Sequence, residues 1–279
     1  MKSVAFRKMH GLGNDFVVLD GRRETIAIDA TAARALADRH TGVGCDQLIV
    51  IEPPSAPAAH VAMRIVNADG SEAEACGNGT RCVAWLVSQE AGHSRVRIET
   101  AGGLLESDLL PSGLVAVDMG MPRVEWQEIP LARRMDTAAV KLSLGPLSRP
   151  VCTNIGNPHA TFFVDDAEAI DLASLGPPLE HDPLFPERAN IGVATVVEPR
   201  RIRLRVWERG VGITRACGSA ACAALVAGYR RRLVGPSATI QLDGGELEVE
   251  LREDDLHVIM TGPATLAFEG SFDASLLGP

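Results

Sequence analysis

An internal repeat constrains the fold of this chain more than any other feature of its sequence. Four landmarks occur in both halves in the same order, offset by 143 residues for the first two and by 141 for the last two. The recurring pairs are Asn14 and Asn157, Gln47 and Asn190, Asn67 and Glu208, and Cys76 and Cys217. Near-constant spacing over four landmarks indicates a duplicated unit. We therefore expect two halves of similar fold, each of which buries its own core.

The length of 279 residues is enough for two domains. Short β-type runs alternate with helical segments at residues 30–40, 80–89 and 219–232, and a turn containing Gly leads into each of the last two. Residues 201–207 alternate Arg with apolar side chains, which is typical of a half-buried strand. Residues 120–150 are rich in Pro and Arg and less regular, so we interpret them as a linker. This pattern predicts an α/β fold class.

Composition argues against several classes of function. The formal net charge is −9, so the chain lacks the basic footprint of a general nucleic-acid binder. No apolar run approaches the ~18 residues of a membrane span, and the first residues show no secretion signal, so we expect a cytoplasmic protein. The three lysines, Lys2, Lys8 and Lys141, lie in no obvious phosphate-binding loop, which argues against pyridoxal chemistry. Neither Cys-x-x-Cys nor His-x-x-x-His occurs, so we expect no metal site.

Two of the six cysteines occupy equivalent strand–turn–helix junctions. Cys76 and Cys217 each precede a Gly and then a helical segment. The free N–H groups and partial positive charge of a helix N-terminus favour a thiolate and can hold a carboxylate. We interpret the remaining cysteines as structural, with a Cys76–Cys82 disulfide as the competing pairing. These four are Cys45, Cys82, Cys152 and Cys222.

Two thiols brought to one substrate from duplicated halves suit proton removal on one face of a carbon and proton return on the other. This is the chemistry of racemisation or epimerisation, and it needs one thiolate and one thiol. His159 and Glu208 lie near the repeated landmarks and are candidates for tuning the thiols, against a turn residue and a solvated charge as the competing interpretations. Arg209 and the carboxamides suit a zwitterionic ligand, although Asn is also common in turns. The carboxamides are Asn14, Gln47, Asn67, Asn78, Asn157 and Asn190.

At these residues the chain resembles the diaminopimelate epimerase family, from about residue 4 to residue 270. The matching motifs are His10-Gly-Leu-Gly-Asn-Asp-Phe, Gly42-Val-Gly-Cys-Asp-Gln-Leu, Asn67-Ala-Asp-Gly-Ser-Glu, Ala75-Cys-Gly-Asn-Gly-Thr-Arg-Cys, Gly156-Asn-Pro-His, Glu208-Arg-Gly-Val-Gly and Ala216-Cys-Gly-Ser. The resemblance implies a cofactor-independent isomerase that interconverts LL- and meso-diaminopimelate, for lysine and cell-wall precursor synthesis. It also implies two pseudo-symmetric domains, each a β-barrel-like sheet around a central helix, with the active site in the cleft between them.

The resemblance assigns roles residue by residue. Cys76 and Cys217 match the acid/base pair, and His159 and Glu208 match positions thought to adjust the thiols. The substrate-binding positions match Asn14, Gln47, Asn67, Gly77, Asn78, Asn157, Asn190, Glu208, Arg209, Gly218 and Ser219. The implied domains are residues 1–120, to which residues 267–279 return, and residues 121–266.

Members of the family often dimerise, and Phe268 matches an aromatic position there. The chain departs from the family pattern at Ile213, Arg215 and Ala220, and directly after Asn190. These departures lie beside the matched contacts, so they bear on details of specificity more than on the chemistry.

Two competing functions remain open at this point. A related two-cysteine racemase, such as a proline racemase or hydroxyproline epimerase, would need a smaller and more apolar pocket than one lined by amides and Arg209. A non-catalytic redox sensor would also use two thiolates. Activity that survives the loss of either cysteine would favour the sensor.

Overall fold

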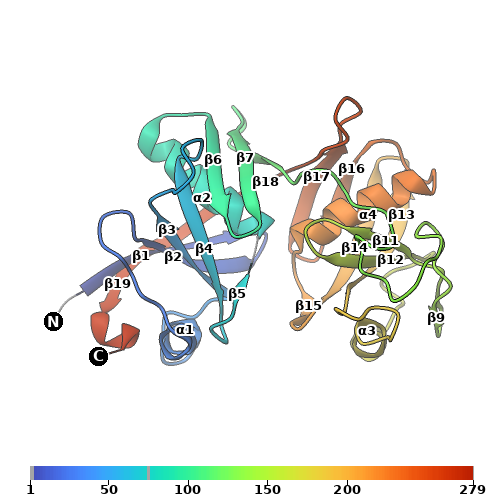
Figure 1. Ribbon diagram of the computed structural model, residues 1–279, viewed down its shortest axis with the longest axis horizontal. Coiled ribbons are helices and arrows are strands. Elements are labelled where there is room, and N and C mark those ends of the chain that lie inside the picture. The colour runs from blue at the N-terminus through green and yellow to red at the C-terminus, as the bar shows by residue number, and fades with distance from the viewer. Residues whose placement is uncertain (1–2, 74–75, 279) are drawn as a thin grey trace. The chain divides into compact units, whose positions relative to one another are not determined.

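A computed structural model of the chain describes residues 3–73 and 76–278 (Figure 1). The chain divides into two compact units. Unit 1 comprises the chain up to Val117 together with the segment from Gly262 onward, and unit 2 comprises Asp118–Thr261. Both units combine a large sheet with α-helices, so the α/β fold class is confirmed.

In unit 1 the strands form one continuous run of pairings. Strand β19 pairs with β1, β1 with β2, β2 with β3 and β3 with β4, and β4 pairs with both β5 and β6. Strand β6 then pairs with β7 and β7 with β8. The strands are β1 (Ser3–Gly11), β2 (Asn14–Asp20), β3 (Gln47–Glu52), β4 (Val61–Asn67), β5 (Glu72–Ala73), β6 (Arg95–Thr100), β7 (Gly103–Leu109), β8 (Val115–Asp118) and β19 (Thr265–Asp273). The helices are α1 (Ala30–Ala37), α2 (Gly77–Ala91) and the short 3₁₀-helix η1 (Ala274–Leu277).

Helix α1 shows how local sequence sets the ends of an element. The carboxylate of Asp29 accepts hydrogen bonds from Thr31 N and Ala32 N, both at 2.8 Å, which confirms Asp29 as the N-cap. The helix ends at Ala37, earlier than predicted, because the next residue, Asp38, is extended. Its apolar side packs into the core of unit 1 with Phe6, Val17, Leu19, Leu48 and Phe272.

In unit 2 the same succession of pairings recurs. Strand β11 pairs with β12, β12 with β13 and β13 with β14, and β14 pairs with both β15 and β16. Strand β16 then pairs with β17 and β17 with β18. The strands are β9 (Ser143–Leu144), β10 (Leu147–Ser148), β11 (Val151–Asn154), β12 (Pro158–Phe163), β13 (Asn190–Glu198), β14 (Arg201–Glu208), β15 (Gly212–Thr214), β16 (Ser237–Leu242), β17 (Gly245–Leu251) and β18 (Val258–Gly262). The helices are α3 (Leu172–Glu180) and α4 (Gly218–Arg230).

The repeat inferred from the sequence is present in the registers of the strands. Phe16 pairs with Gln47 across parallel strands β2 and β3, and His159 pairs with Asn190 across β12 and β13, each partner 143 residues further on. Ile65 pairs with Ala73 in unit 1, and Val206 pairs with Thr214 in unit 2, each partner 141 residues further on. Because registers are fixed by hydrogen bonds along a whole strand, this agreement shows that the two halves share one fold.

Helix α4 is the central helix of unit 2. Nearly all of its residues are buried, and it contacts β11, β12, β13, β14, β16 and β17. Its Ala-rich sequence allows strands to approach closely on all sides, and at Gly228 even a Cβ would lie 2.9 Å from Val234 Cγ2. Strand β14 meets the helix with Ile202, Leu204 and Val206, which are buried, while the intervening arginines remain partly exposed. The predicted alternation is thus confirmed.

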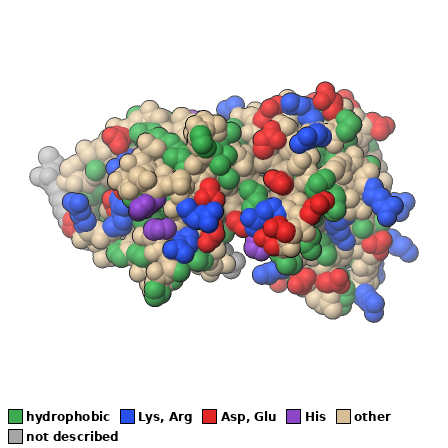
Figure 2. Space-filling model, turned by 90° about the horizontal axis from the view of Figure 1, so that it is seen from above, with side chains coloured by type: hydrophobic (Ala, Val, Ile, Leu, Met, Phe, Trp, Pro, Cys, Tyr) green, Lys and Arg blue, Asp and Glu red, His purple; other side chains and the backbone are tan. Residues whose placement is uncertain are grey.

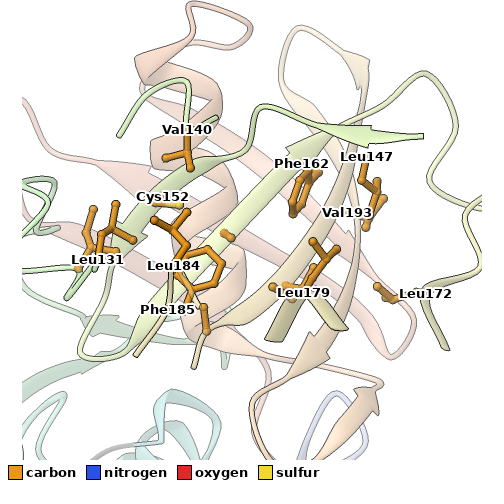
Figure 3. Close-up of a cluster of buried hydrophobic side chains, with 14 of the residues drawn as sticks. Leu131, Val140, Leu147, Cys152, Phe162, Leu172, Leu179, Leu184, Phe185 and Val193 are labelled. Carbon is orange, nitrogen blue, oxygen red and sulfur yellow. The ribbon is translucent and has the colours of Figure 1, made fainter. Parts of the chain in front are cut away.

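The interpretation of residues 120–150 as a linker is wrong. Figure 3 shows Leu131, Val140 and Leu147 packed among the side chains of the unit 2 core, including Phe162. Val140 and Leu147 are completely buried. The segment is irregular because its prolines interrupt strands and helices, but its apolar side chains cover one side of the core.

Helix α3 was not predicted from the sequence, because it contains Pro177 and Pro178. Asp171 caps it by accepting from Ser174 N at 3.2 Å, and Leu172 and Leu179 bury its apolar side. Tertiary packing thus maintains a short helix that local propensity disfavours. None of the helices in the described ranges has the length and apolar character needed to cross a bilayer.

Candidate active site

Cys76 is the N-cap of helix α2. Its backbone is extended (φ −147°, ψ 106°), and its Sγ accepts a hydrogen bond from Gly79 N at 3.4 Å. Its carbonyl oxygen accepts from both the N–H and the hydroxyl of Thr80, at 2.8 and 2.9 Å. The sulfur therefore lies at the positive end of the helix, where an N–H donor stabilises negative charge. The residue is partly exposed.

Two predicted carboxamides lie beside this sulfur. Asn14 Oδ1 is 3.9 Å from Cys76 Sγ and accepts from Asn78 Nδ2 at 3.0 Å. At the other end of the same amide, Asn14 Nδ2 donates to Asp46 Oδ2 at 3.0 Å. Since both ends are engaged, the Asn14 oxygen is directed to the thiol side.

Gln47 and Asn67 form a second polar pair in unit 1. They are register partners on β3 and β4, and Gln47 Nε2 donates to Asn67 Oδ1 at 2.8 Å. Gln47 also pairs in register with Phe16, two residues after Asn14. The sequence motifs thus converge at the ends of neighbouring strands, with Gly77, buried in the first turn of α2, completing the predicted set.

Arg81 is a residue of this site that sequence reasoning did not single out, although it lies inside the Cys76 motif. It is completely buried, and its Nη2 donates to Asn78 Oδ1 at 2.9 Å while its Nε donates to Pro263 O at 3.1 Å. A Cβ at Gly11 would come within 2.7 Å of Arg81 Nη2. The buried guanidinium thus fixes Asn78 and requires a glycine at position 11.

Cys217 is the equivalent N-cap of α4 in unit 2, and Gly218 begins that helix. Its carbonyl oxygen accepts from Ala221 N at 3.1 Å, and its Sγ lies 3.5 Å from Ser219 Oγ. In contrast to Cys76, the residue is buried, with 5% exposed.

The expectation that the helix N-terminus lowers the pKa of Cys217 is wrong. Burial raises the pKa of this thiol well above its usual range, and the negative charge of Glu208 raises it further. The hydrogen bond with Ser219 and the N–H of Ala220 act in the opposite direction but do not compensate. At neutral pH Cys217 is therefore a neutral thiol.

Glu208 ends strand β14 and accepts a hydrogen bond from Thr214 Oγ1. The next residue, Arg209, donates its backbone N–H to Asn190 Oδ1 at 2.9 Å, while its Nη1 donates to the carbonyl of Glu187, also at 2.9 Å. Asn190 in turn donates from Nδ2 to Pro158 O at 3.0 Å. These bonds connect the ends of β12, β13 and β14, as the repeated landmarks suggested.

His159 is buried (2% exposed) and its Nε2 lies 2.7 Å from Asn157 Oδ1. Burial lowers the pKa of His159 to about 3, with a further contribution from the positive charge of Arg209. The imidazole is therefore neutral at physiological pH. Any influence of His159 on a thiol comes from its hydrogen bonding and its dipole, because it carries no charge there.

All six cysteines lie within the described residues and are thiols, so the alternative Cys76–Cys82 disulfide is not formed. Burial raises the pKa of Cys45 to about 11 and the pKa values of Cys82 and Cys152 to about 12. Such thiols are unreactive near neutral pH. Cys222 is also completely buried.

The comparisons with known proteins agree with this arrangement. The family model for diaminopimelate epimerase matches residues 6–125 and 151–267. A diaminopimelate epimerase from Rhodospirillum centenum is 59% identical over 272 residues, covering 98% of this chain and 93% of the relative. Another from Acidiphilium cryptum is 55% identical over 274 residues, covering 98% of each chain.

A solved structure of a hydroxyproline epimerase from Agrobacterium vitis has a TM-score of 0.70 against this chain. The alignment covers 96% of this chain and 92% of that one at 15% identity, so the likeness concerns the fold. The family match and the relatives, taken together over almost the whole length, show that this chain belongs to the diaminopimelate epimerase family, which is a family of isomerases.

Proposed function

We propose that this protein interconverts LL- and meso-diaminopimelate by a two-base mechanism in which Cys76 and Cys217 act on opposite faces of the α-carbon. The observation that carries the proposal is the equivalent placement of the two cysteines as helix N-caps in two units of the same fold. Their surroundings differ in the way that a two-base reaction requires, because burial and Glu208 keep Cys217 protonated. Membership of an isomerase family favours this function over a thiol sensor.

In one direction the Cys76 thiolate takes the α-proton and becomes a thiol. The electron pair of the broken C–H bond remains on the α-carbon as a carbanion, and the Cys217 thiol then donates its proton to the other face. Cys217 ends as a thiolate, and the reverse reaction uses the two groups in exchanged roles. N–H groups at the starts of α2 and α4 stabilise negative charge on the substrate carboxylate as the carbanion forms.

The polar residues beside the two cysteines hold the substrate. A diaminopimelate molecule carries an amino group and a carboxylate at each end, so it needs both donors and acceptors in both units. Carboxamides provide both kinds of group, and Arg209 and the hydroxyl of Ser219 provide donors in unit 2. In this proposal the substrate contacts are Asn14, Gln47, Asn67, Gly77, Asn78, Asn157, Asn190, Glu208, Arg209, Gly218 and Ser219, and His159 and Glu208 tune the thiols.

Incubation of the purified protein with LL-diaminopimelate in deuterated water should produce meso-diaminopimelate carrying deuterium at the inverted carbon. Because the acid and the base are both side chains of this chain, the rate should be unchanged by a chelator and by added pyridoxal phosphate. Chiral chromatography with mass spectrometry measures both outcomes. Proline and trans-4-hydroxyproline serve as parallel substrates, and inversion of either of them instead of diaminopimelate would transfer the function to the related racemases.

We extend the proposal to a cytoplasmic homodimer with a small-molecule substrate. The mechanism needs two reduced thiols, which a reducing compartment maintains. On the face drawn in Figure 2, acidic and basic side chains are interspersed over each unit, which supports a small-molecule substrate over a nucleic acid.

Phe268 supports self-association, because this aromatic side chain on β19 is 51% exposed and rests edge-on against Phe6, with the ring centroids 6.0 Å apart. Light scattering should therefore give twice the 29.6 kDa mass of one chain, and Phe268→Asp should reduce it to that of the monomer. A monomeric wild-type protein at micromolar concentration would contradict the dimer.

A further inference from the structure

Glu180, the last residue of α3, has a carboxylate that is almost completely buried (2% exposed). Its Oε2 accepts a hydrogen bond from Trp207 Nε1 at 2.7 Å, and its Oε1 accepts from Gly210 N at 2.9 Å. Arg188 Nη1 lies 3.3 Å from the same Oε1. A buried carboxylate is costly unless its oxygens are paired with donors, and here each oxygen has at least one.

The two donors from the β14–β15 hairpin flank the residues of the candidate site. Trp207 directly precedes Glu208, and Gly210 directly follows Arg209. Glu180 therefore holds both ends of the Glu208–Arg209 dipeptide from outside the hairpin. Gly210 has φ +75°, a left-handed conformation that lets its N–H point at the carboxylate within a tight turn.

The helix that carries Glu180 is itself fitted against the hairpin. A Cβ on Gly176 would lie 2.5 Å from Trp207 Cδ2, so the indole packs directly on the backbone of α3. This contact leaves little freedom for the indole N–H, which is aimed at Glu180. The helix, the indole and the carboxylate together form a rigid support for the hairpin.

We propose that Glu180 is a positioning residue: by holding Trp207 and Gly210, it keeps the Glu208 carboxylate against the Cys217 thiol. The catalytic consequence rests on the proposed roles of Glu208 and Cys217, whereas the positioning itself does not. Glu180 does not exchange protons with substrate in this scheme, because its two oxygens are acceptors for fixed donors. Its influence reaches the reaction through the protonation of Cys217, whose pKa the charge of Glu208 raises.

Glu180→Gln tests the proposal with almost no change in volume. An amide has one accepting oxygen, so its NH₂ group must face either the Trp207 N–H or the Gly210 N–H, and that end of the dipeptide is released. With Glu208 no longer held, the pKa of Cys217 should fall by about one unit. Carbon-13 NMR of protein labelled at the cysteine Cβ measures this titration, with Cys217→Ser used to assign the signal.

Three further variants separate positioning from simple destabilisation. Glu180→Asp keeps the charge but withdraws it from both donors, so it should shift the titration in the same direction and decides the matter if Glu180→Gln does not fold. Adding Trp207→Phe to Glu180→Gln removes the donor that the NH₂ group would face, and it should restore most of the titration and of kcat/KM. Asp171→Ala removes the N-cap of the same helix and should leave the Cys217 titration unchanged.

In the epimerase assay Glu180→Gln should lower kcat/KM by about tenfold, restored in part by Trp207→Phe. An unchanged Cys217 titration in folded Glu180→Gln or Glu180→Asp would overturn the proposal, as would an equal shift in Asp171→Ala. The NMR titration needs no substrate, so a protein inactive on diaminopimelate would contradict the proposed function and leave the positioning role to be decided by the titration.

Discussion

Replacing Cys76 with alanine should lower kcat/KM for epimerisation by about 10⁴-fold or more, and replacing Cys217 should have the same effect. General acid–base groups contribute ~10²–10⁴-fold, and here each thiol is the proposed proton carrier for one face of the carbon. A single remaining thiol can return a proton only to the face from which it took it. Each variant should therefore still exchange the α-hydrogen of one epimer with deuterated water while failing to invert the carbon.

The control for this experiment lies in the same helix. Cys82 is completely buried in α2, six residues after Cys76, and its burial holds its pKa at about 12. Cys82→Ala should cost some stability through the cavity that it leaves, but it should keep the folded enzyme's activity within a few fold. Inversion by Cys76→Ala at more than a tenth of the wild-type rate would refute the two-base assignment.

Acid should destabilise the wild-type protein more steeply than a His159→Gln variant. Burial lowers the pKa of His159 from 6.5 to about 3, so below pH 6.5 the unfolded chain binds a proton that the folded chain does not. The stability that the neutral histidine contributes is present above pH 6.5 and is lost as the pH falls toward 3. The slope amounts to about 1.4 kcal/mol per pH unit, and the total loss to at most about 5 kcal/mol.

Urea unfolding between pH 7 and pH 4 measures this difference. Carboxylates whose pKa is lowered by ion pairs, such as Asp15 beside Arg39 and Lys8, also weaken the fold in acid, but they act equally in both proteins. The difference between wild type and His159→Gln therefore isolates the buried imidazole. His181→Gln, at an exposed histidine, should follow the wild-type curve. Parallel curves for His159→Gln and the wild type would show that His159 titrates normally.

The sequence by itself determined the duplicated plan and the two cysteine junctions. Offsets of 143 and 141 residues between landmarks became equal offsets between strand registers, because a register is set by the pattern of residues along the strand. The helices begin directly after Cys76 and Cys217, because extended caps and small residues at a turn are local signals. The grouping of Asn14 and Asn78 beside Cys76 follows from the same motifs.

Only the tertiary structure decided how the two cysteines differ. Both share the same local motif and the same helix position, yet Cys217 is buried next to Glu208 while Cys76 is partly exposed. Burial and the placement of a carboxylate nine residues away in sequence depend on how strands and helices pack. Helix-terminus chemistry alone therefore predicted the wrong direction for the pKa of Cys217.

The same reason explains the two errors in the organisation of unit 2. Residues 120–150 look like a linker because their periodicity is weak, and α3 looks unlike a helix because it contains prolines, but both bury leucines in one core. Glu180 carries no motif, and its role emerges only when α3 brings it to the indole of Trp207 and the N–H of Gly210. Local sequence specifies caps, turns and strand alternation, whereas the burial of a charge depends on contacts between residues that are distant along the chain.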